Sequence, residues 1–329
     1  MKTTHLKGIL YSLLFAIPAW FLGNYFPLIG GPVFGILLGM LFAGVQRPNS
    51  LEAGLTFTGK KILQYSIILL GFEMNFFNVL AIGGHSFSVM LFTLATSFLT
   101  AWLAGRLLNL DAKTTTLIGA GTGICGGSAI AAVAPVIKAK DQDIVFSIST
   151  IFLFNVIAVF LFPFLGHLWG LSDTGFGMWA GTAINDTSSV VAAGYSYSEA
   201  AGSYATIVKL TRALMIVPIC LIAAVIMTHK EKSADKAGSF KLRKIFPFFI
   251  LWFVVACIIN TSGFLPSEIS HLLGSLGKFS IVLAMSAIGL NTHLTSLIKN
   301  GIRPILLGLI CWAAVAAASL LVQHLWGII

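Results

Sequence analysis

Long apolar runs, separated by glycine, proline and charged residues, make up most of this chain. A helix needs about 20 mostly apolar residues to cross the hydrocarbon core of a bilayer. On this pattern we predict nine full spans, at 8–27, 32–46, 62–82, 86–105, 144–166, 203–228, 245–262, 270–291 and 303–328. Two further segments, 115–137 and 176–199, are interrupted by glycine and polar residues. The pattern predicts an all-α polytopic membrane protein with a single integral domain, 1–329.

The two interrupted segments carry related motifs sixty positions apart, GTGICGGSAI at 121–130 and GTAINDTSSV at 181–190. Irregular backbone survives at bilayer depth only where it is buried in protein or lines a water-filled cavity. A helix that begins there points free N–H groups and the positive end of its dipole into the gap, which favours an anion. The motifs therefore predict the binding site of a transporter. Close packing of helices through small residues remains the alternative, although packing does not require Asn185 and Asp186.

Two basic residues, Lys209 and Arg212, lie three positions apart in the apolar run 203–228 and hence on one helical face. With Asp186 as the nearby acid, they leave a surplus positive charge, which favours an anionic substrate; a plain ion pair with Asp186 is the alternative. The residues expected to bind the substrate are Gly121, Thr122, Cys125, Gly126, Gly127, Ser128, Asn185, Asp186, Thr187, Ser188, Lys209 and Arg212.

Asp186 and Glu73 are the candidates for coupling to a proton or sodium ion, because a carboxylate in an apolar run is costly. Asp186 is also well placed to cap the helix that follows it. Glu73 lies about ten residues before the end of the span 62–82. A proton-relay carboxylate and a structural hydrogen-bonding group are the two alternatives for its role. His293 is expected at the interface, and Asn155 and Asn260 are expected to form hydrogen bonds between helices.

Charged residues are 9% of the chain, against about 25% in soluble domains, and the net charge is +9. Lysine and arginine gather in alternate loops, above all in the loop 229–244, so we predict a cytoplasmic N-terminus rather than nucleic-acid binding. Lys138 and Lys140 follow the first motif and favour re-entrant hairpins, the first entering from the cytoplasm and the second from outside. Crossing, broken helices are the alternative.

A second echo, at an offset of 218, repeats Gly59-Lys60, Gly71 and Gly83 as Gly277-Lys278, Gly289 and Gly301. Both echoes fit an inverted repeat, with elements at about 59–170 and 176–328, a plan common in secondary carriers. In a chain with 33 glycines, coincidence is the alternative.

The sequence lacks the motifs that are typical of several other classes of protein. The chain has no Walker A pattern, and its four cysteines form neither a CxxC pair nor a Cys/His cluster, so we expect no ATP-driven transport, no metal and no cofactor. We expect no enzymatic activity, because no catalytic constellation is found. The expected partners are a small anion, the lipid bilayer and a second copy in a homodimer. A channel and a non-transporting scaffold or sensor are the rival functions.

The strings GTGICGGSAIAA at 121–132, AINDTSSVVAA at 183–193 and KLTR at 209–212 together resemble the YeiH-type sulfate exporter family. The resemblance covers nearly the whole chain. It implies a bacterial inner (cell) membrane protein of the bile-acid, arsenite and riboflavin transporter-like superfamily, whose members are inverted-repeat carriers with crossed broken helices. It also implies sulfate, a related sulfur oxyanion or an organosulfonate as the substrate. From the two motif segments we expect alternating access, in which the site-bearing bundle moves against a scaffold of the remaining helices as an elevator.

Overall fold

The computed structural model describes residues 3–26, 30–230, 247–292 and 301–329. All regular elements within these ranges are helices. Six of them are long and apolar enough to cross a membrane, namely His5–Tyr25, Phe76–Leu107, Gln142–Leu168, Glu199–Met227, Ser267–Leu290 and Ile302–Leu325. The predicted multi-pass helical membrane protein is therefore confirmed. The predicted loop 229–244, from residue 231 onward, and His293 lie outside the described residues.

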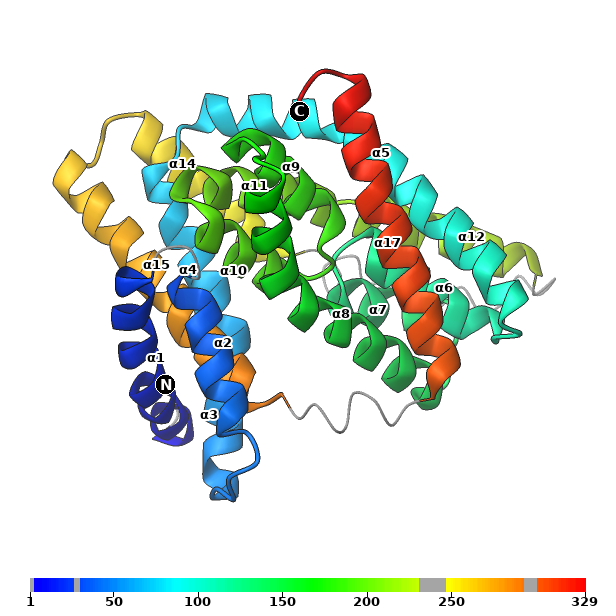
Figure 1. Cartoon of the computed structure of the whole chain (residues 1–329), viewed down its shortest axis with the longest axis horizontal. Helices are drawn as coiled ribbons and strands as arrows, with labels where there is room; N and C mark the ends of the chain where they lie inside the picture. Colours follow the sequence, from blue (N-terminus) through cyan, green and yellow to red (C-terminus); the bar gives the residue numbers. More distant parts are fainter. Residues whose placement is uncertain (1–2, 27–29, 231–246, 293–300) are drawn as a thin grey trace.

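The helices form two bundles (Figure 1). The scaffold bundle contains α1 (Thr3–Tyr25), α2 (Gly31–Leu41), η1 (Asn49–Leu51), α3 (Glu52–Phe57), η2 (Thr58–Ile62), α4 (Leu63–Leu70), η3 (Gly71–Glu73), α14 (Phe248–Thr261) and α15 (Ser267–Leu290). The hairpin bundle contains α5 (Phe76–Leu107), α6 (Ala112–Gly123), α7 (Gly127–Val136), α8 (Asp141–Leu168), α9 (Asp173–Ala183), α10 (Thr187–Tyr197), α11 (Glu199–Ala213), α12 (Ile216–Lys230) and α17 (Ile302–Leu325).

The first motif is the tip of a helical hairpin made by α6 and α7. Lys113 Nζ, in the first turn of α6, donates a hydrogen bond to the carbonyl oxygen of Lys138, just after α7, at 2.6 Å. The hairpin thus begins and ends at the same place. This is the hairpin geometry that the charge pattern favours, and it differs from the crossing helices that the family resemblance implies.

The second motif is the tip of a hairpin made by α9 and α10. Ser198 Oγ, after α10, donates to Asp173 Oδ1 at the start of α9 at 2.6 Å, and the Tyr197 hydroxyl donates to the carbonyl oxygen of Leu171. The two hairpins also break at matching positions, because α6 and α9 end at Gly123 and Ala183, sixty residues apart. The interruptions therefore lie where the motifs predict them.

The predicted boundary between the spans 62–82 and 86–105 is wrong. The helix of α3 to η3 ends at Glu73, and α5 begins at Phe76 and continues through residues 83–86. Asn75 sets the start of α5, because its side-chain oxygen accepts from the backbone N–H groups of Phe77 and Asn78. Glu73 consequently lies in the last turn of a helix instead of ten residues inside one.

The predicted span 203–228 is broken between α11 and α12. Met215 N donates to the carbonyl oxygen of Arg212 at 3.0 Å, the tightened bonding of a helix end. Pro218, which has no N–H group to continue the ladder, lies in the first turn of α12, where none is needed. Two other predicted spans are short, since α2 has 11 residues and α14 has 14. These two and the span 62–82, whose helix ends at Glu73, are absent from the six candidate spans of the described residues, whereas Glu199–Met227, which runs through α11 and α12, is one of the six.

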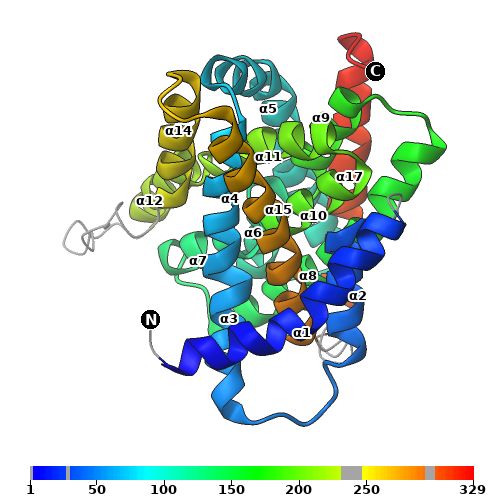
Figure 2. The ribbon, with the colours of Figure 1, turned by 90° about the vertical axis from the view of Figure 1, so that its left-hand side faces the viewer.

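The second echo is visible in one helix pair. A Cβ atom at Gly59 would meet Ile288 at 3.0 Å, and one at Gly277 would meet the backbone of Leu70 at 3.3 Å. These two contacts correspond to each other at the offset of 218, and α15 packs against the run from η2 to α4 (Figure 2). The inverted repeat of 59–170 and 176–328 as a whole stays a prediction.

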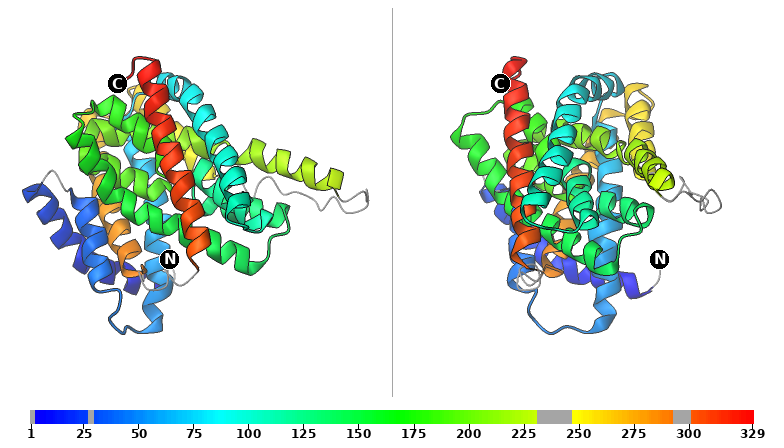
Figure 3. Two further views of the ribbon diagram at one scale, coloured as in Figure 1. Left: turned by 45° about the vertical axis from the view of Figure 1, so that its right-hand side comes forward. Right: turned by 90° about the vertical axis from the view of Figure 1, so that its right-hand side faces the viewer.

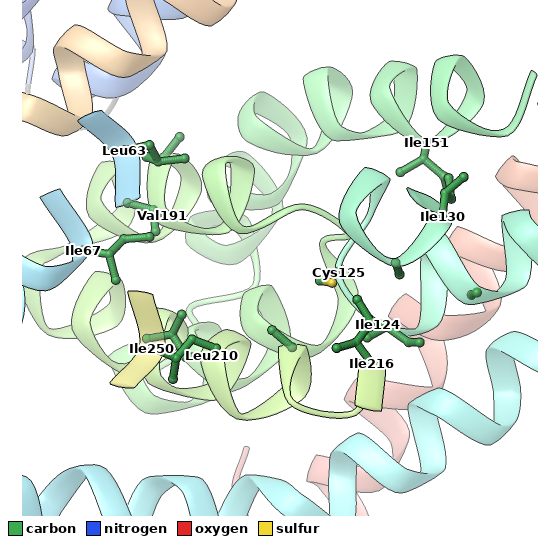
Figure 4. Close-up of a cluster of buried hydrophobic side chains, with 14 of the residues drawn as sticks. Leu63, Ile67, Ile124, Cys125, Ile130, Ile151, Val191, Leu210, Ile216 and Ile250 are labelled. Carbon is green, nitrogen blue, oxygen red and sulfur yellow. The ribbon is translucent and has the colours of Figure 1, made fainter. Parts of the chain in front are cut away.

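An apolar cluster continues from one bundle into the other (Figure 4). It includes Ile67 and Ile250 of the scaffold bundle together with Val191 and Leu210 of the hairpin bundle. The helix α12 packs against α7 and projects beyond the rest of the molecule (Figure 3). The main contact between the bundles is therefore hydrophobic, and the hairpin tips lie within the hairpin bundle.

Candidate functional site

The two hairpin tips meet. A Cβ atom at Gly126, in the first tip, would lie 3.2 Å from Cβ of Asp186, in the second. The tips come from segments sixty residues apart in sequence, and α8 lies between them in the chain. The structure thus brings together the two motifs that the sequence singles out.

Lys209 joins both tips through backbone carbonyl groups. Its Nζ donates to the carbonyl oxygens of Ile124 at 2.9 Å, Ile184 at 3.0 Å and Asn185 at 2.5 Å. The side chain is fully buried. All three protons of the ammonium group therefore have acceptors within the protein.

Arg212 makes a second set of bonds to the same tips. Its Nε donates to the carbonyl oxygen of Gly123 at 2.7 Å, Nη1 donates to that of Ile184 at 3.2 Å, and Nη2 donates to that of Thr122. It is also fully buried. The last carbonyl groups of a helix have no partner within it and carry partial negative charge. The two cations thus provide hydrogen-bond donors for the carbonyl groups at the ends of α6 and α9 and offset their partial negative charge.

Asp186 does not form the ion pair with Lys209 or Arg212 that the sequence allows, since no nitrogen of either lies within 4 Å of its carboxylate among the described ion pairs. Its Oδ2 accepts from Ser188 N at 3.0 Å and from the Ser188 hydroxyl. Its backbone N–H donates to Asn155 Oδ1 of α8 at 3.0 Å. The capping role of Asp186 and the interhelical role of Asn155 are both confirmed.

The start of α7 is built differently from that of α10. Gly126 is the residue before α7, with φ +65°, and no side chain caps this helix. A Cβ atom at Gly127 would meet nothing within 4 Å, and Ser128 is exposed. The N–H group of Ala129, which is buried, bonds to the Cys125 thiol. The N–H groups of α7 beside open space are therefore those of Gly127 and Ser128, whereas the start of α10 meets the carboxylate of Asp186.

Three buried polar atoms near the tips have no hydrogen-bond partner: Thr122 Oγ1, Asn185 Oδ1 and Asn185 Nδ2. The matching hydroxyl in the second hairpin, Thr182, is satisfied by Met178 O and by Ser319 Oγ at 2.6 Å each. Buried polar groups are nearly always paired, so an unpaired one requires a specific explanation, such as a water molecule or a ligand.

Other predicted site residues serve the packing of the hairpins. A Cβ atom at Gly121 would lie 3.0 Å from Ile130 and Ile151, so no ligand fits beside it. Cys125 is buried in the apolar cluster (Figure 4). Thr187 is half-buried and begins α10. The packing interpretation therefore holds for Gly121, and the open part of the site is the start of α7.

Glu73, the second coupling candidate, pairs with α15 rather than with a hairpin tip. Its carboxylate lies 3.4 Å from Lys278 Nζ and 3.3 Å from His271 Nδ1. Lys278 is not among the site residues predicted from the sequence, although it belongs to the echo at offset 218. Among the described residues, no group of three or more His, Cys, Asp or Glu side chains is arranged to hold a metal ion.

Comparison with known proteins places the chain in a family. The model of the family described as conserved hypothetical protein 698 matches residues 7–308. The UPF0324 membrane protein of Streptococcus pyogenes serotype M6 is 49% identical over 337 residues, 99% of each chain. UPF0324 membrane proteins of Clostridium tetani, 46% identical over 97% of each chain, and Fusobacterium nucleatum, 43% identical over 98% of this chain and 99% of its own, are similarly related. The chain belongs to the conserved hypothetical protein 698 family of membrane proteins.

Proposed function

We propose that this protein is a secondary active carrier of a small anion, which binds between the hairpin tips at the start of α7. The contrast between the two helix starts carries this proposal. The start of α10 holds the carboxylate of Asp186, while the matching position before α7 is Gly126 and has no capping side chain. The carboxylate of Asp186 shows how the start of α10 binds a negative group, and we infer that the start of α7 binds the anion of the substrate in the same way.

The balance of charge supports an anionic substrate. The two helix starts and two helix ends at the tips contribute partial charges of about half a unit each, which cancel. Lys209 and Arg212 against Asp186 then leave a surplus of about one positive charge in a buried site. The ammonium group of Lys209 acts on the substrate through this field, since its three N–H groups are bonded to carbonyl groups. Thr122 and Asn185 provide unpaired donors and acceptors nearby.

The charge and the family resemblance together favour a small oxyanion or organosulfonate of the sulfate type. A surplus of one charge suits a monoanion directly; a dianion requires a co-transported proton or sodium ion, for which Asp186 is the candidate. The two-bundle architecture supports alternating access, with the hairpin bundle moving against the scaffold bundle in an elevator mechanism. A carrier of a small carboxylate and an anion channel are the alternative functions. We expect neither a cofactor nor enzymatic activity.

The test is flux into proteoliposomes that contain the purified full-length protein. Uptake of sulfate, sulfite, thiosulfate, taurine, bicarbonate and small carboxylates is measured with and without a proton or sodium gradient. A carrier gives saturating uptake of one of these anions that responds to a gradient. Uptake that rises linearly with concentration would identify a channel, and absence of uptake for all of them would contradict the proposal.

The site itself is tested by Gly127→Val, with Gly84→Val as the matched control. Neither glycine has an atom within 4 Å of the position of an added Cβ, so both changes fit the fold. Only the first fills the space before the N–H groups of α7. Loss of one hydrogen bond to a charged ligand is worth about tenfold or more in affinity, so Gly127→Val should lower uptake by that factor. Equal uptake in the two variants would place the site elsewhere.

A further inference from the structure

Lys278 lies where the two bundles meet. Its Nζ is 3.4 Å from Oε2 of Glu73 and 2.9 Å from Oε1 of Glu199. Lys278 and Glu73 both belong to the scaffold bundle, on α15 and η3. Glu199 begins α11, directly after the second hairpin, and so belongs to the hairpin bundle. One ammonium group therefore has a partner in each bundle.

The two partners of Lys278 differ in how firmly they are held. Glu73 fills the space that a side chain at Gly274 would occupy, since a Cβ atom there would lie 1.9 Å from its Cδ. His271 Nδ1 lies 3.3 Å from the same carboxylate, whose side chain is 22% exposed. Glu199 is 76% exposed and makes no other ion pair among the described residues. Glu73 is thus a built-in partner, and Glu199 is one that the other bundle supplies.

Away from this ion pair, the contact between the bundles is largely apolar. Ile67 and Ile250 face the hairpin bundle within the shared hydrophobic cluster (Figure 4). At another part of the interface, the position of a Cβ atom on Gly30 would lie 2.8 Å from Cα of Ser196. Apolar contacts have no fixed direction, so bundles can slide across them without stranding polar groups. Separating Lys278 from the exposed Glu199 would be costly if the half-buried ammonium group were left unpaired. Lys278 avoids that cost, because Glu73 stays with it.

We propose that the pair of Lys278 with Glu199 is a latch between the bundles. It holds the hairpin bundle in the position seen here and opens when that bundle moves, while Glu73 keeps Lys278 paired within the scaffold. The latch rests on the proposed function only in that it assumes a movement of the hairpin bundle. Lys278 is a positioning residue and does not touch the anion.

The test uses a cysteine at Ser196 as a reporter of the interface. Ser196 is 1% exposed, faces Gly30 of the scaffold, and its hydroxyl bonds only to the carbonyl oxygen of Ala192 in its own helix at 2.7 Å. In Ser196→Cys protein reconstituted in liposomes, the rate of modification by N-ethylmaleimide measures how often the interface opens. The native cysteines Cys125, Cys220, Cys257 and Cys311 are buried, and the parent protein gives their background rate.

Adding Glu199→Gln should raise the rate at residue 196 about two- to fivefold, the range expected for a partly exposed ion pair. Glu268→Gln is the matched control, because Glu268 is an exposed acid on α15 without an ion pair among the described residues, and it should leave the rate unchanged. Lys278→Arg keeps both pairings and should also keep the parent rate.

Equal rates in the Glu199→Gln and Glu268→Gln proteins would overturn the latch. If the reporter variant does not fold, hydrogen exchange of residues 196–202 in Glu199→Gln protein provides the second measurement, and unchanged exchange has the same meaning. Neither measurement needs a substrate. A raised rate without any anion uptake would leave the latch standing and reject the carrier, whereas uptake with unchanged rates would do the reverse.

Discussion

Lys209 and Arg212, one turn apart on α11, donate to the same carbonyl oxygen, that of Ile184, at 3.0 and 3.2 Å. Each also bonds to the first hairpin, so α11 holds both tips in a fixed relation. Polar backbone groups inside a membrane protein must find partners within it. The two cations therefore have a structural role, and their charge remains at the site while they bond to these carbonyl groups.

We expect Lys209→Met to lower the free energy of unfolding by about 3 kcal/mol or more, because the carbonyl groups of Ile124 and Asn185 lose their donor and that of Ile184 keeps only its bond to Arg212. Lys60→Met, at an exposed position, should change it by less than about 0.5 kcal/mol. Denaturant unfolding of the two purified variants measures both values. Similar midpoints for the two proteins would show that the carbonyl bonds of Lys209 contribute little.

Two substitutions distinguish the capping role of Asp186 from the role of its charge. Asp186→Asn keeps an acceptor for Ser188 N and should cost little stability, whereas Asp186→Ala should cost about 1 kcal/mol. If this carboxylate takes the coupling proton, anion uptake by Asp186→Asn protein should no longer respond to a proton gradient. Retained coupling in that variant would assign the proton site to another group.

Substitution of the two tip glycines, Gly126 and Gly127, should have very different effects on the free energy of unfolding. Gly126 combines φ +65° with ψ −134°, a conformation that residues with a Cβ atom avoid, and it lies against Asp186. We expect Gly126→Ala to cost about 1–3 kcal/mol. Gly127→Ala enters open space at the first turn of α7 and should be neutral or slightly stabilising. Thermal unfolding compares the two, and equal losses would contradict the contact between the tips.

Asn155 accepts from the backbone N–H of Asp186 and so positions the second tip. Asn155→Leu should lower the free energy of unfolding by about 1–3 kcal/mol, since a buried N–H group is left unpaired. The exposed Asn78, changed to leucine, is the control and should have little effect. A water molecule that replaces the lost amide would be revealed by unchanged stability in Asn155→Leu.

The charge pattern predicts that the bases of the two hairpins face opposite sides of the membrane. Gln142, near the base of the first hairpin, and Thr174, at the base of the second, are both exposed. In cells, a membrane-impermeant maleimide should modify Thr174→Cys from outside and should reach Gln142→Cys only after the membrane is opened. Labelling of both from the same side would reject the predicted orientation.

Much of the site is visible in the sequence because it depends on local rules. The interruptions at Ile124 and Ile184 follow from glycine and polar residues in apolar segments, and the cap at Asp186 follows from the residues beside it. The predicted helix boundaries differ from the structure where a local signal outweighs the apolar pattern. Asn75 starts α5, although Gly83 and Gly84 suggest a loop, and Pro218 marks the break after α11.

The partners of the buried charges depend on distant parts of the chain. The sequence offers Asp186 as the obvious partner of Arg212, yet the structure pairs the guanidinium with carbonyl groups about ninety residues away in the chain. The pairing of Lys278 with Glu199 joins residues 79 positions apart. Such contacts follow from how helices pack, which hydropathy and motif spacing do not specify.

The sequence by itself determined that this chain is a multi-pass helical membrane protein with two broken segments, because the apolar run lengths and backbone hydrogen bonding act locally. Only the tertiary structure decided that the tips of the two hairpins meet, that Lys209 and Arg212 bind the ends of α6 and α9, and that Asp186 pairs with neither of these cations. The physical reason is that a buried polar group takes whichever partner the packed helices bring within reach.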